Sequence, residues 1–159
     1  MKELFEILRY RLLWLNIVLL IISALMMFHY HFLSLITFAL LINLYDILGY
    51  HFTLIRRSTQ LPDKIIIRAY RLHQLLFEIL FMLFIAFVIG LKYAISCSII
   101  KWFGLQDVLY YLVLQKKIPG RFTWMKWTPF GILKSDLSKN EVIFQAVVGI
   151  IISVLILTI

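Results

Sequence analysis

Apolar residues gather along the chain into five long runs that are separated by short polar segments. The runs cover about residues 12–28, 32–54, 72–89, 93–114 and 142–159. A helix needs about 20 mostly apolar residues to cross the hydrocarbon core of a bilayer, and each run is close to that length. The pattern therefore predicts an all-α polytopic membrane bundle of five transmembrane helices, folded as a single membrane domain over residues 1–159.

Turn-forming and capping residues stand at the boundaries of these runs. Pro62 cannot occupy a helix interior, and Asp63 directly after it is a favoured N-cap. Gly90 divides the long apolar stretch between the third and fourth runs. Ser138 and Glu141 have the spacing of a capping box, in which each side chain bonds the backbone of the other residue at a helix start. We therefore expect helices to begin near Asp63 and Ser138.

A four-span reading competes with the five-span one. In it, the third span continues to about residue 100 and residues 104–115 form an interfacial helix. Lysines and arginines of short loops stay in the cytoplasm. With five spans and a cytoplasmic N-terminus, all sixteen lysines and arginines except Lys92 and Lys101 fall on that side, mostly in the loops 55–71 and 115–141. With four spans they divide almost evenly, so the charge pattern favours five spans and an outside C-terminus.

Composition agrees with the membrane class. The chain is 63% apolar and 15% charged, whereas a soluble domain is about half apolar and a quarter charged. The net charge of +8 does not indicate nucleic-acid binding, because the bases lie in blocks between apolar runs. Cys97 is the single cysteine, which excludes an intramolecular disulfide. We expect an integral protein of a prokaryotic cell (inner) membrane, with the first run retained rather than cleaved as a signal.

Three acidic residues lie inside the predicted spans, where charges are costly and normally face other helices or a cavity. In the five-span reading Asp46, Glu78 and Asp107 are each six to eight residues from the cytoplasmic end of a different helix. At 1.5 Å per residue, their depths are all roughly 9–12 Å. The acids are therefore expected to share one layer and to supply acid or base groups.

Other polar residues share helix faces with these acids. By helical spacing Asn43 and Tyr50 fall on the face of Asp46, while Lys101 and Tyr111 are near that of Asp107. Basic and imidazole residues close to the cytoplasmic ends are expected to form a rim that holds a phosphate or anionic headgroup. The rim residues are His51, Arg56, Arg57, Arg68, Arg71 and His73.

Metal chemistry has little support in the sequence. No HxxxH, ExxH, HExxH or CxxC spacing occurs, so we predict no metal-ligand set. A divalent cation held between the three carboxylates remains open as a cofactor.

These features lead to a functional hypothesis. We expect a small membrane protein that binds or modifies a lipid or isoprenoid at an intramembrane carboxylate and basic site near the cytoplasmic face. The first alternative is a non-catalytic accessory subunit or assembly factor of a larger membrane complex. The second is a small oligomeric transporter or channel. The expected partners are membrane lipids, further copies of the chain or other subunits, and the sequence leaves open whether the protein is an enzyme.

Overall fold

The structure is a computed structural model, and it describes residues 7–55 and 63–158. In chain order its elements are α2 (Arg11–Met26), α3 (Leu33–Ile55), α4 (Asp63–Val88), α5 (Leu91–Trp102), α6 (Leu105–Val113), β1 (Arg121–Phe122), α7 (Pro129–Leu133), β2 (Leu137–Ser138) and α8 (Lys139–Thr158). The two short strands, β1 and β2, pair antiparallel, and every other element in the described residues is a helix. The all-α expectation is therefore confirmed.

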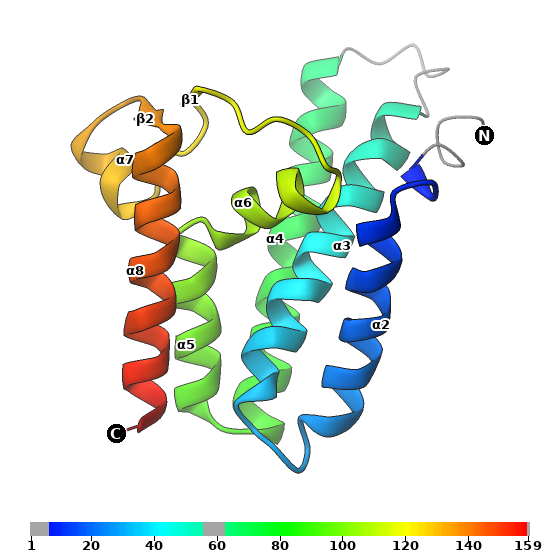
Figure 1. Cartoon of the computed structure of the whole chain (residues 1–159), viewed down its shortest axis with the longest axis vertical. Helices are drawn as coiled ribbons and strands as arrows, with labels where there is room; N and C mark the ends of the chain where they lie inside the picture. Colours follow the sequence, from blue (N-terminus) through cyan, green and yellow to red (C-terminus); the bar gives the residue numbers. More distant parts are fainter. Residues whose placement is uncertain (1–6, 56–62, 159) are drawn as a thin grey trace.

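Five helices run along the long axis of the molecule. In Figure 1, α2, α3, α4, α5 and α8 alternate in direction, and the turns 27–32 and 89–90 lie at the same end. The segment 115–138, which contains β1, α7 and β2, lies toward the opposite end. This alternation is the order of helices that five membrane crossings require.

Length and apolarity separate these helices into three groups, and α5, with 12 residues, is the shortest. Within the described residues, Ile67–Val88 and Lys139–Thr158 are long and apolar enough to cross a membrane. Arg11–Met26 and Leu33–Gly49 are apolar but shorter. A bundle with five crossings therefore stays a prediction.

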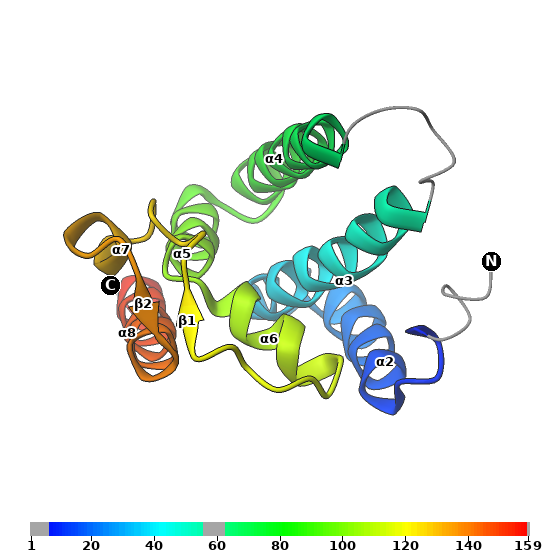
Figure 2. The same cartoon turned by 90° about the horizontal axis from the view of Figure 1, so that it is seen from above.

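The stretch 93–114 does not form one helix. The chain reverses at Gly90, so the single long span to residue 100 that the four-span reading needs is wrong. The straight helix of the five-span reading is also wrong, because α5 ends at Trp102 and α6 begins at Leu105. Gly104 between them has φ 76°, a left-handed conformation that glycine adopts without steric cost. In Figures 1 and 2, α6 runs across the bundle instead of continuing α5.

Contacts between helices use both apolar clusters and small polar pairs. Phe38 of α3, Ile85 of α4 and Cys97 of α5 are buried in the largest cluster. Between α5 and α8, the Ser96 hydroxyl donates to the Ser153 carbonyl at 3.2 Å, and the Ser153 hydroxyl donates to the Ser96 carbonyl at 2.9 Å. Small residues let two helix backbones approach closely, and their hydroxyls then bond across the interface.

The start of α8 has the predicted capping box. The Ser138 amide donates to the Glu141 carboxylate at 2.7 Å, and the Glu141 amide donates to the Ser138 hydroxyl at 3.4 Å. Lys134 lies 2.8 Å from the same carboxylate. The Lys134 ammonium and the Ser138 amide lower the pKa of Glu141, which precedes the apolar run, to about 2. The carboxylate is therefore ionised at neutral pH, where it favours the helix N-terminus.

The conformation at Gly104 yields a first prediction. Gly104→Ala places a Cβ in the left-handed region and only 2.3 Å from the Met125 side chain, so it should cost about 1–2 kcal/mol. The midpoint of thermal unfolding in a mild detergent should fall by several degrees. Gly120→Ala is the matched control, since no atom lies within 4 Å of its added Cβ. Equal midpoints for the two variants would contradict a strained break between α5 and α6.

Candidate functional site

A cavity of about 730 Å³ lies beside α6 and is bounded by α3, α4, α5, α6 and the 115–138 segment. All three acids named in the sequence analysis line it. The complete wall consists of Asp46, Ile67, Tyr70, Arg71, Gln74, Leu75, Glu78, Lys101, Gln106, Asp107, Tyr110, Tyr111, Trp124 and Trp127. We call this cavity the carboxylate pocket.

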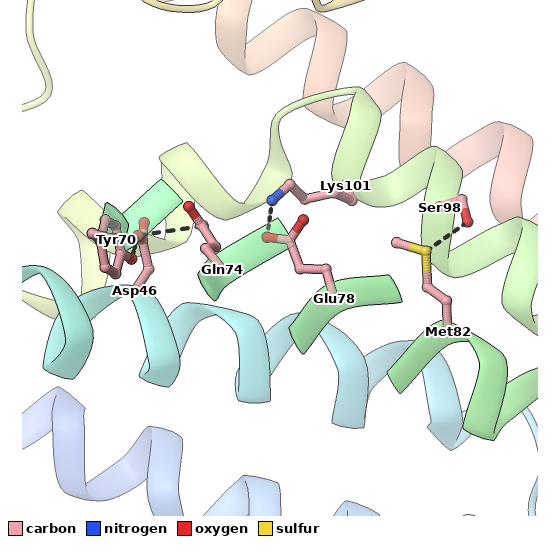
Figure 3. Close-up of polar contacts among 7 residues, drawn as sticks. All are labelled: Asp46, Tyr70, Gln74, Glu78, Met82, Ser98 and Lys101. Atoms are coloured by element: carbon pink, nitrogen blue, oxygen red, sulfur yellow. Dashed lines mark hydrogen bonds and ion pairs between the residues drawn. The ribbon is translucent and has the colours of Figure 1, made fainter. Parts of the chain in front are cut away.

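Asp46 of α3 accepts hydrogen bonds from α4. The Tyr70 hydroxyl donates to Oδ1, and the Gln74 amide donates to the same oxygen at 3.4 Å. Tyr70 and Gln74 are four residues apart and therefore lie on one face of α4. Figure 3 shows Asp46 facing both side chains.

Glu78 lies one further turn along the same face of α4 and pairs with Lys101 near the end of α5. The Glu78 side chain is only 7% exposed, whereas the Lys101 side chain is 28% exposed. Figure 3 shows the ammonium pointing at the carboxylate. A buried charge is tolerated when a partner compensates it. Because Glu78 is on α4 and Lys101 is on α5, the ion pair also joins these two helices.

Asp107 reaches the pocket because α6 crosses the bundle. It lies in the first turn of α6 and accepts a hydrogen bond from the Trp124 indole at 2.9 Å. The neighbouring Gln106 is buried and lines the same cavity. Trp127 is held beside them because its carbonyl accepts from the Trp102 indole at 2.6 Å. The 115–138 segment therefore supplies a wall of the pocket.

The other predicted binding residues are divided between several places. Arg71, Lys101 and Tyr111 line the pocket. Arg68 and His73 are exposed and lie outside its wall, and the His73 ring contacts the Ala69 carbonyl at 2.8 Å.

Asn43 does not face the pocket. It is fully buried against α2, where its amide donates to Asn16 at 3.1 Å. The side chains of Tyr50 and His51, and residues Arg56 and Arg57 entirely, lie outside the part of the structure that is described. Their proposed roles stay predictions.

Several wall residues were missed by sequence reasoning. Tyr70 could have been found, because it precedes Gln74 and Glu78 by one and two helical turns on the same face. Gln106 and Tyr110 required knowledge of how α6 is oriented. Trp124 and Trp127 belong to a segment whose mixture of aromatic and basic residues is also typical of an ordinary interfacial loop.

The pocket is better suited to hydrogen bonding than to metal coordination. In residues 7–55 and 63–158, no group of three or more His, Cys, Asp and Glu side chains could hold a metal ion. Each of the three carboxylates instead accepts from a side chain of its own, namely Tyr70, Lys101 or Trp124. The described residues therefore offer carboxylate oxygens to a ligand that can donate hydrogen bonds or carries positive charge.

Comparison of the chain with protein-family models, curated proteins and solved structures finds no match. The class defined by the fold and the site is an all-α bundle with a partly open pocket lined by three carboxylates. Its function has to be argued from the chemistry of that pocket.

The Glu78–Lys101 pair yields a second prediction. Lys101→Met leaves the buried Glu78 without its cation and should destabilise the fold by about 3 kcal/mol or more. The double variant Lys101→Met with Glu78→Gln removes both charges and should recover most of the loss. Thermal unfolding in detergent measures both effects.

The control for this pair is Lys134→Met, which breaks the exposed pair with Glu141 and should cost less than about 1 kcal/mol. A double variant as unstable as Lys101→Met alone would show that charge compensation is not what Lys101 provides.

Proposed function

We propose that the chain is an integral membrane protein that crosses the bilayer five times, with its N-terminus in the cytoplasm. The alternating helices support this order, and so does the apolar outer surface. Phe87, Leu25 and Leu80 are 87%, 72% and 65% exposed, and they belong to a much larger set of exposed apolar side chains. Exposing such a surface to water would be strongly unfavourable, whereas the lipid tails of a membrane would cover it.

Within this arrangement, we propose that the carboxylate pocket binds a lipid or isoprenoid by its polar head. A single observation supports the proposal most strongly: one cavity joins acidic side chains inside to apolar, exposed side chains at its edge. Leu75 and Trp127 of the pocket wall are 52% and 84% exposed. A molecule with a polar head and an apolar tail matches both parts.

The dimensions of the pocket are compatible with this ligand. Sites for small molecules usually measure about 300–1,000 Å³, and the pocket of about 730 Å³ is within that range. Leu75 lies on the same face of α4 as the exposed Leu72 and Ile79. A tail that leaves the pocket beside Leu75 would therefore continue along an apolar helix surface.

The acids have separate tasks in this proposal. Asp46 and Asp107 would accept hydrogen bonds from the head, while the Glu78–Lys101 pair keeps α4 and α5 in position. If the bound head reacts, either aspartate could take a proton from it as a general base, provided that the proton lies within hydrogen-bond distance.

Lipid retention provides the third prediction. Wild-type protein purified in a mild detergent should carry a lipid class that mass spectrometry of the extract identifies. Asp46→Asn and Asp107→Asn should each reduce the retained amount about tenfold, because a hydrogen bond to a charged group contributes about 1.5–3 kcal/mol. Asp136→Asn is the control, since Asp136 lies in the 115–138 segment but outside the pocket wall. Identical lipid profiles for all four proteins, each shown to be folded, would contradict the proposal.

A further inference from the structure

The charges in the wall of the carboxylate pocket are unbalanced toward the negative. Lys101 pairs with Glu78, and its charge also acts on Asp46 and Asp107, so a single ammonium is shared among three carboxylates. Asp46 and Asp107 accept hydrogen bonds from neutral groups, namely the Tyr70 hydroxyl, the Gln74 amide and the Trp124 indole. Two carboxylates in a mostly apolar surrounding are costly unless a positive charge compensates them.

Arg71 does not correct this imbalance in the interior. It lines the pocket and shares a face of α4 with Gln74 and Glu78, but its side chain is exposed. Of the four arginines expected to hold a phosphate, Arg71 is the one that the described structure places in the wall. A phosphate group in the interior would meet Asp46 and Asp107 and would be repelled by both.

The remaining wall residues also suit a cation. Five aromatic side chains line the pocket: Tyr70, Tyr110, Tyr111, Trp124 and Trp127. The face of an aromatic ring carries partial negative charge and attracts an ammonium group placed over it, and tryptophan and tyrosine are effective in this role. Aromatic rings combined with carboxylates are therefore a suitable surrounding for a positively charged nitrogen.

We infer that the pocket selects a ligand with an ammonium group, which donates hydrogen bonds to Asp46 and Asp107 and lies against the aromatic wall. The inference rests on the proposed function, because it names the chemical class of the head that the pocket would bind. It replaces the phosphate or anionic headgroup expected from the sequence. The ammonium could belong to a membrane amphiphile or to a small amine that enters from water.

A matched series of compounds tests the inference. Dodecylammonium, dodecyl phosphate and dodecanol share one tail and differ in the head, and butylammonium keeps the head with a short tail. Each is titrated into the protein in a neutral detergent, and the rise in the thermal midpoint gives an apparent affinity, because a ligand stabilises the state that it binds. Dodecylammonium should raise the midpoint more than dodecyl phosphate and dodecanol do.

Variants then locate the binding. Asp46→Asn and Asp107→Asn should each weaken dodecylammonium by about tenfold or more. Trp127→Leu should weaken it by about two- to fivefold, as expected for one exposed cation–π contact. Asp136→Asn and Trp14→Leu, which lie outside the pocket wall, should leave the affinity unchanged. These two substitutions control for lost charge and for a lost tryptophan.

The outcomes separate the inference from the proposed function. Stronger binding of dodecyl phosphate, lost in Arg71→Gln, would overturn the ammonium inference and leave amphiphile binding standing. Equal affinity for butylammonium and dodecylammonium, both sensitive to Asp46→Asn, would support the ammonium inference and contradict a lipid ligand. If all four compounds bound and neither Asp46→Asn nor Asp107→Asn weakened the binding, the ammonium inference and the proposed function would both be overturned.

Discussion

The break between α5 and α6 is the constraint on which the rest of the pocket depends. A helix that stops inside an apolar bundle leaves backbone carbonyls without their usual partners, and the apolar side chains around them offer no replacement. Gln145 of α8 provides one, because its buried amide donates to the Phe103 carbonyl at 3.1 Å. The same side chain accepts from the Phe130 amide at 2.8 Å. One residue therefore holds together the end of α5, the start of α7 and the middle of α8.

The course of α6 follows from this break. With α5 ended, α6 turns across the bundle, contacts α2, α3 and α8, and brings Asp107 to the cavity that Asp46 and Glu78 also line. A straight continuation of α5 would not position α6 against α2 and α3 in this way. Polar pairs elsewhere, such as Asn16 with Asn43 and Ser96 with Ser153, join helices away from the pocket. Polar residues in this bundle thus have two separate uses, helix association and the lining of a cavity.

Much of this arrangement is predictable from local sequence. The helix boundaries at Gly90 and at Ser138 follow from glycine and capping patterns. Counting residues along the runs grouped the three acids that line the pocket, but it placed Asp107 on a straight helix that does not form. The break at Gly104 was not predictable in the same way. A glycine inside an apolar run also fits a continuous helix, and Gln145, which makes the break acceptable, lies 42 residues from Phe103.

Helix rotation explains the error at Asn43. Three residues along a helix correspond to a separation of about 60° around its axis, so Asn43 and Asp46 appear to share a face. In the structure Asn43 faces α2, where it bonds Asn16, whereas Asp46 faces α4, where it bonds Tyr70. Only the placement of neighbouring helices decides which of them a polar residue faces.

The orientation of the chain in a membrane tests the central claim most directly. In a Cys97→Ser background, single cysteines at Lys92 and at Ser135 are exposed to a membrane-impermeant maleimide in intact cells that express the protein. The account predicts labelling at residue 92 and protection at residue 135 until the membrane is opened. Labelling of both positions in intact cells would contradict it, because the segment that closes the pocket would then lie on the same side as residue 92 and the chain would not cross the bilayer between them.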